Sequence, residues 1–112
     1  MDNKIILVSS NQLGKGEEAL GETVLETFFT LLKQRESLPN AIFLMNTGVF
    51  TATENSLVSV HLGELENKGV QVYACRTCVE HYEVSDKLTV GQIKGMDLFV
   101  ELASNYEVIT IS

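Results

Sequence analysis

Short apolar runs alternate with amphipathic stretches along the chain. Residues 5–8 form a continuous β-rich run, which is typical of a strand buried on both faces. Comparable runs at residues 41–45, 70–74 and 108–111 predict three more strands, and a shorter run at 88–90 predicts a weak one. The pattern therefore predicts a sheet to which both ends of the chain contribute.

The segments between these runs have the spacing of helices, at residues 17–34, 56–68, about 77–83, and 97–104. In the segment 17–34, two adjacent rows of apolar residues form one broad apolar face. The central row, or stripe, is Leu20, Val24, Phe28 and Leu31, and Leu25, Phe29 and Leu32 widen it. Because strands that alternate with helices are typical of a parallel sheet covered on both faces, we expect a single α/β domain over residues 1–112.

Three predicted loops, at residues 9–16, 46–55 and 75–82, follow strands and meet at one edge of such a sheet. Ligands and reactive groups gather at the carboxyl ends of parallel strands, so this edge is where we expect the functional site. The first loop lacks the features of a phosphate-binding loop. Ser9 and Gly16 stand where that motif needs a glycine and a hydroxyl residue.

The most distinctive motif is the pair Cys75 and Cys78, which follows the third predicted strand. The spacing leaves four interpretations open. The pair is either a reactive thiol site that carries sulfur or a thioredoxin-like dithiol. Alternatively, it belongs to a metal site in which His81 is the third ligand and His61 or water is the fourth. In the fourth interpretation, the cysteines are two small buried apolar residues. The late position in the chain weakens the thioredoxin interpretation. Val79 after the second cysteine excludes a c-type haem site.

Charge and composition narrow the classes of partner. The chain has 112 residues with eight Lys plus Arg against fifteen Asp plus Glu, so its net charge is −7. This balance argues against binding to a nucleic-acid backbone or to anionic lipid, which both require a basic surface. No apolar run approaches the length of a membrane span or resembles a signal peptide. Two cysteines only three positions apart do not form a disulfide framework, so we expect a cytoplasmic protein.

Several motifs together resemble those of the DsrE-like (DsrE/DsrF-like) family of small sulfur-handling proteins. Within that family the sequence is most similar to the C-terminal domain of the YedF-type, sulfurtransferase-like selenium-metabolism proteins. The segments that carry the resemblance are residues 7–10, 13–16, 20–21, 43–49, 65–70, 75–78, 86–91 and 108–111. The N-terminal Cys-Pro domain usual in YedF-type proteins is absent, so we expect a stand-alone relative or an excised domain. That subgroup also usually has Gly where Arg76 stands.

The resemblance implies a three-layer α/β/α sandwich on a five-stranded parallel sheet. It also implies that a cysteine after the third strand carries a persulfide, and Cys75 is the matching position. Cys78 is then the second cysteine shared with the subgroup. The resemblance implies no organic cofactor and no metal. It implies sulfur donor and acceptor proteins as partners, and a homo-oligomer that is a dimer or a trimer.

These inferences lead to two hypotheses. In the first, Cys75 is the sulfur acceptor and is more reactive than Cys78, because a helix beginning near Thr77 points its free N–H groups at the Cys75 sulfur. Five further residues in the three loops are expected to support the site: Arg76, His81, Asn11, Asn46 and Gly48. In the second hypothesis, the chain is a non-catalytic binding or assembly subunit with inert cysteines.

Overall fold

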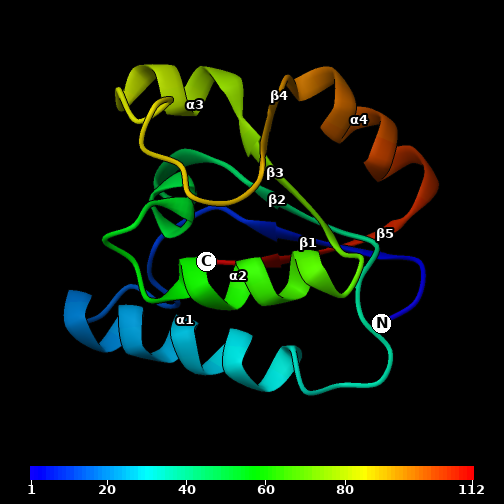
Figure 1. Ribbon diagram of the computed structural model, residues 1–112, viewed down its shortest axis with the longest axis horizontal. Helices are drawn as coiled ribbons and strands as arrows, with labels where there is room; N and C mark the ends of the chain where they lie inside the picture. The colour runs from blue at the N-terminus through cyan, green and yellow to red at the C-terminus, as the bar shows by residue number, and fades with distance from the viewer.

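The computed structural model describes all residues from 1 to 112. Strands and helices alternate along the chain, as the sequence pattern predicts (Figure 1). In order, the elements are β1 (Lys4–Val8), α1 (Glu18–Leu32), β2 (Ala41–Leu44), the 3-10 helix η1 (Asn46–Ala52), α2 (Val58–Asn67), β3 (Gln71–Cys75), α3 (Arg76–His81), β4 (Gln92–Lys94), α4 (Met96–Asn105) and β5 (Glu107–Ile111).

The five strands form one parallel sheet in the order β4-β3-β2-β1-β5. Val8 of β1 is in register with Leu44 of β2, and Leu44 is in register with Ala74 of β3. The three central strands therefore end at the same level, and the segments that follow them leave the sheet side by side. The predicted α/β fold with a five-stranded parallel sheet is confirmed.

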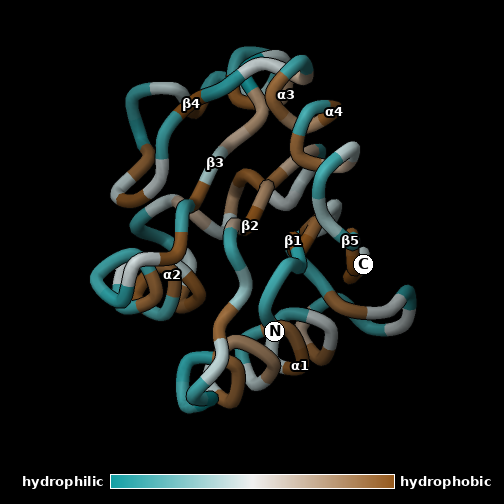
Figure 2. Tube along the Cα trace, turned by 90° about the vertical axis from the view of Figure 1, so that its right-hand side faces the viewer, coloured by the Kyte–Doolittle hydropathy of each residue, from teal (hydrophilic) through white to brown (hydrophobic).

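Helices α1 and α2 lie next to each other on one face of the sheet, and α4 lies on the other face (Figure 1). Helix α3 continues directly from the carboxyl end of β3. The main core fills the space between the sheet and the first two helices, where the strands are strongly apolar (Figure 2). On the opposite face the ring of Phe43 packs against Phe99 of α4, with ring centroids 5.2 Å apart. None of the helices combines the length and apolar character needed to cross a membrane.

Helix α1 does not bury the stripe on which the sequence prediction centred. The buried side chains are those expected only to widen it, Leu25, Phe29 and Leu32, whereas Leu20 and Leu31 are 59% and 58% exposed. The buried face also includes Gly21, where an added Cβ atom would lie 2.6 Å from Cβ of Gln12 in the preceding loop. The sequence shows that the helix is amphipathic, but two adjacent apolar stripes left its rotation open.

The fourth strand lies after the predicted position 88–90. Strand β4 is Gln92–Lys94, paired with residues 73–75 of β3. Leu88 makes only an isolated antiparallel bridge with Thr53. Gly91, with φ of +88°, turns the chain into the strand. An edge strand pairs on one side and needs no continuous apolar run, which explains why the apolar run before it was misleading.

Gly48 is required by a close backbone contact. A Cβ atom at this position would lie 2.2 Å from the carbonyl oxygen of Val8, at the end of β1. We expect Gly48→Ala to lower the free energy of unfolding by about 1–3 kcal/mol, because backbone must move to admit the methyl group. Urea denaturation followed by circular dichroism measures the change.

Gly63, inside α2, supplies the matched control. A Cβ atom there meets no atom within 4 Å, so Gly63→Ala should stabilise the protein by about 0.5–1 kcal/mol through helix propensity. Equal urea midpoints for Gly48→Ala and the unsubstituted protein would contradict the close contact.

Candidate functional site

The two cysteines lie at the carboxyl end of β3, where the sequence predicts them. Cys75 is the last residue of the strand and the N-cap of α3, and Cys78 lies within that short helix. Alternation along β3 puts Cys75 on the same face of the sheet as Tyr73, the face that α4 covers. Both thiols are free. The motif thus brings two thiols together at the functional edge of a parallel sheet.

The accessibility of the two thiols is the reverse of the expected one. Cys75 is only 3% exposed, whereas Cys78 is half-buried. Partial burial raises the pKa of Cys78, and the neighbouring Cys75 side chain raises it further, while the Asn46 N–H lowers it in part. Cys78 is therefore the more reachable sulfur but is held in its thiol form up to a higher pH than an ordinary cysteine.

The segment after β2 forms the second wall of the site. The backbone N–H of Asn46 donates to Sγ of Cys78 over 3.1 Å. Asn46 has a φ of +50°, a left-handed conformation that asparagine tolerates better than most residues, and this turn starts η1. Asn11, from the loop after β1, donates its backbone N–H to Oγ1 of Thr47 at 3.3 Å. Three loops predicted to meet are thus joined through η1, and Gly48 contributes by its close fit against Val8.

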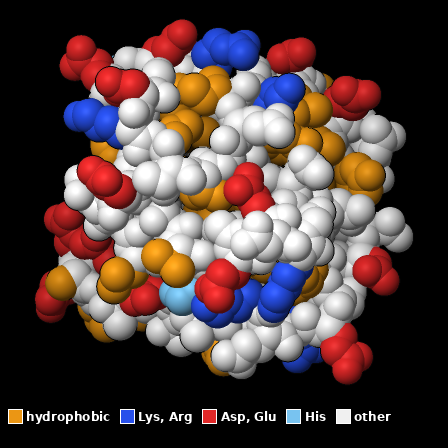
Figure 3. Space-filling model, viewed as in Figure 1, with side chains coloured by type: hydrophobic (Ala, Val, Ile, Leu, Met, Phe, Trp, Pro, Cys, Tyr) orange, Lys and Arg blue, Asp and Glu red, His pale blue; other side chains and the backbone are white.

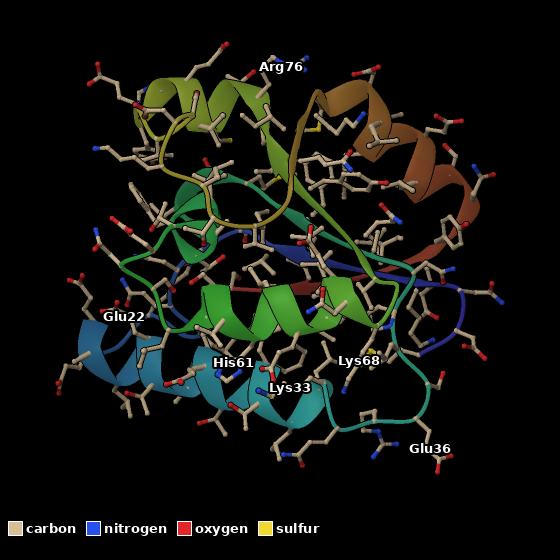
Figure 4. All side chains as sticks on the ribbon, in the orientation of Figure 1. Glu22, Lys33, Glu36, His61, Lys68 and Arg76 are labelled. Carbon is tan, nitrogen blue, oxygen red and sulfur yellow. The ribbon has the colours of Figure 1, made fainter.

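The remaining predicted supporting residues are not in contact with the thiols through any hydrogen bond or ion pair. Arg76 is exposed and forms no ion pair (Figure 4). His81 is also exposed, and its ring packs edge-on against Tyr82, with centroids 4.9 Å apart. No group of three His, Cys, Asp or Glu side chains is arranged to hold a metal ion, so the spacing from Cys75 to His81 gains no support as a zinc site.

His61 lies between α1 and α2 (Figure 4), and the histidine visible in Figure 3 is bordered by basic and acidic side chains. Its Nδ1 is 2.8 Å from Nζ of Lys33, and its Nε2 is 3.2 Å from Oε2 of Glu26. Lys33 also pairs with Glu64, and this contact lowers the pKa of the Glu64 carboxyl. The histidine therefore links two helices and is not a fourth ligand for the cysteines.

The model of the DsrE/DsrF-like family matches residues 7–111, nearly the whole chain. The chain belongs to the DsrE/DsrF-like family. No curated protein matches it by sequence.

Solved structures share its fold at low sequence identity. The YchN protein from E. coli superposes with a TM-score of 0.73 at 20% identity, over 99% of this chain and 100% of that one. MTH1491 from Methanobacterium thermoautotrophicum gives 0.65 at 18% identity, over 96% of each chain. BT1422 from Bacteroides thetaiotaomicron gives 0.67 at 17%, over 97% of this chain and 95% of that one. The last two are described as proteins of unknown function, and all three establish the fold alone.

Sequence reasoning missed two features of the site. One is the backbone donor of Asn46 to Cys78, for which the Asn-Thr-Gly turn after β2 was a usable signal. The other is the packing of Phe50 in η1 against Tyr82 after α3, with ring centroids 4.9 Å apart. This contact joins the two segments that carry Asn46 and Cys78. Nothing in the spacing of the two aromatic residues indicates it.

The pH dependence of Cys78 alkylation tests the proximity of the thiols. In the unsubstituted protein, the raised pKa of Cys78 should shift half-maximal alkylation by iodoacetamide above the pH of an ordinary thiol. In Cys75→Ala the half-maximal pH should fall, because the neighbouring side chain that raises the pKa is gone. The half-maximal pH of this variant should still lie above that of the urea-unfolded protein, because Cys78 stays partly buried.

Mass spectrometry can follow each thiol separately, because trypsin cleaves after Arg76 and leaves the two cysteines in different peptides. The same half-maximal pH for Cys78 with and without the Cys75 side chain would contradict the interaction between the thiols.

Proposed function

We propose that this protein is a sulfurtransferase-like persulfide carrier with Cys75 as the sulfur acceptor. The observation that carries the proposal is the placement of two free thiols side by side at the carboxyl end of β3. Membership of the DsrE/DsrF-like family supports it, since the sequence resemblance implies a persulfide on the cysteine after the third strand. The raised pKa of Cys78 makes this thiol a poorer nucleophile than an ordinary cysteine.

The proposed reaction needs no cofactor. The Cys75 thiolate attacks the outer sulfur of a donor persulfide, R–S–S–H. The donor S–S bond breaks, the donor leaves as a thiolate, and Cys75 holds the sulfur as Cys75–S–SH. An acceptor thiolate then attacks that outer sulfur and releases the Cys75 thiolate. If the Cys78 thiolate attacks the inner sulfur, a Cys75–Cys78 disulfide forms and hydrosulfide leaves.

Burial adds one requirement to this mechanism. Because Cys75 is only 3% exposed, the donor persulfide reaches its sulfur only after a local opening of the site. The half-buried Cys78 lies next to it and marks the side from which a partner approaches.

The partners we propose are proteins that deliver and accept sulfane sulfur, in the cytoplasm, where both cysteines stay reduced. A role in selenium metabolism would follow only from the resemblance to the YedF-type subgroup.

The burial of Cys75 also favours a second candidate function, an assembly or binding subunit with inert cysteines. Thiol titration in the native state separates the two. Reaction at both cysteines supports the carrier, and no reaction at either supports the subunit.

Loading with sulfane sulfur tests the assignment of Cys75. After incubation with a persulfide donor, the unsubstituted protein and Cys78→Ser should gain one sulfur atom in the mass spectrum, and Cys75→Ser should gain none. Serine keeps the size of the side chain, so a folding defect is not the cause, and circular dichroism checks this. Normal loading of Cys75→Ser together with loss in Cys78→Ser would make Cys78 the carrier.

We also propose a homo-oligomer, a dimer or trimer. Four large apolar side chains on α1 and at the start of α2, helices that lie next to each other on one face of the sheet, are more than half exposed: Leu20, Leu31, Leu57 and Val60. Surfaces of this kind mark interaction sites. Light scattering at micromolar concentration should give a mass above that of the monomer. A monomer mass across the concentration range would count against the proposal.

A further inference from the structure

A cleft of about 500 Å³ lies on the opposite side of η1 from the thiols. Its walls are the N-terminal half of α1, the loop after β1, η1, and the segment that joins η1 to α2. Figure 4 shows Glu22 on this half of α1, below the segment that leads into α2. No cysteine, lysine or arginine lines the cleft, so it is separate from the proposed sulfur site.

Two carboxylates one helical turn apart, Glu22 and Glu26, line the cleft, and neither pairs with a lysine or an arginine. Glu22 is exposed and makes no hydrogen bond or ion pair. The only ionisable partner of Glu26 is His61, through Nε2 at 3.2 Å. Like charges at this helical spacing repel each other, so the pair is unfavourable while the cleft is empty.

His61 leaves the charge of Glu26 in place. The ammonium of Lys33 can only donate, so Nδ1 of His61 accepts its hydrogen bond and the ring proton lies on Nε2. The histidine is then neutral and donates to Oε2 of Glu26, and the hydroxyl of Thr30 lies 3.3 Å from the same nitrogen. Lys33 is itself paired with Glu64. The imidazole therefore orients the Glu26 carboxylate without neutralising it.

Two threonine hydroxyls of the cleft also present acceptors. Oγ1 of Thr23 donates its proton to the carbonyl of Ala19 at 3.0 Å, and Oγ1 of Thr53 donates to the carbonyl of Phe50 at 2.7 Å. Their oxygen lone pairs are what a ligand would meet. Side-chain carbonyls of two asparagines, Asn11 and Asn55, add further acceptors.

We propose that this cleft binds an organic cation rich in N–H donors, a guanidinium or primary ammonium group. The carboxylate of Glu22, which has no partner, and that of Glu26, whose only partner is a neutral imidazole, match such a group, whose donors are distributed in space. The half-buried ring of Phe50 supplies an apolar wall on which a guanidinium can stack. A compact metal ion does not fit, because no three ligating side chains converge. The cation belongs either to a free diamine or to an arginine or lysine side chain of a partner protein.

Titration of the ¹⁵N-labelled full chain with agmatine tests the proposal by NMR at about 0.15 M salt, where long-range attraction is screened. We expect saturable shifts at the amides of Thr23, Thr53 and Asn55. Glu22→Gln and Glu26→Gln should each weaken binding about tenfold or more, because each removes a charge-assisted hydrogen bond. Glu22 makes no interaction, so its loss does not disturb the fold.

Glu101→Gln on α4 is the matched control, since it removes the same charge from the other face of the sheet and should leave binding unchanged. A diol of the same length as agmatine should not bind. Absence of saturable shifts, or equal weakening in Glu101→Gln, would overturn the proposal.

Blocked N-acetylarginine methylamide separates the two sources of the cation. If it shifts the same amides, the cleft accepts a side chain of a protein. If only agmatine does so, the ligand is a free diamine. Both results support the cation site, and neither depends on sulfur transfer by Cys75.

Discussion

The site depends on one carbonyl group, that of Val8 at the end of β1. It accepts the backbone N–H of Met45 at 2.9 Å, and it lies so close to Gly48 that no side chain fits between them. Two successive constraints thus fix the course of the chain as it leaves β2. They hold η1 against the end of the sheet and place Asn46, between them, with its N–H toward Cys78. A parallel sheet brings strand ends together, but this contact determines how tightly the following segments pack.

The sequence was sufficient for the fold because its strongest signals are periodic. Central strands such as residues 41–44 are buried throughout and read as unbroken apolar runs. The errors lie where burial is partial. Strand β4, at the edge, has one exposed and two half-buried residues, and its short sequence carries no alternation that distinguishes it from a loop. For α1, Leu20 and Leu25 look equally suited to the core, and the buried face that contains Leu25 also contains Gly21, which has no room for a side chain beside Gln12.

For the site, the sequence located the thiols but not their surroundings. A strand followed by a helix places Cys75 at the junction, which is local information. The burial of Cys75 depends on segments distant in sequence, and so does the donor that Asn46 offers to Cys78. From the sequence alone, the position of Cys75 just before the helix favours it as the more reactive thiol. In the structure Cys75 is buried, because strand alternation points its side chain under α4. Cys78 lies three residues further along, in α3, and is only half-buried.

The two faces of η1 present opposite chemistry for a physical reason. On one face, the thiols are partly desolvated and lie near a backbone N–H, which favours a neutral sulfur or one that holds negative charge only with help from that donor. On the other face, the hydroxyl protons of Thr23 and Thr53 are donated to backbone carbonyls, so their oxygen lone pairs line the cleft together with two carboxylates. The same short 3-10 helix borders both, because its first N–H donates to Cys78 while the hydroxyls of Thr51 and Thr53 donate to carbonyls within it. This single backbone segment thus separates the two thiols from the cleft that Glu22 and Glu26 line.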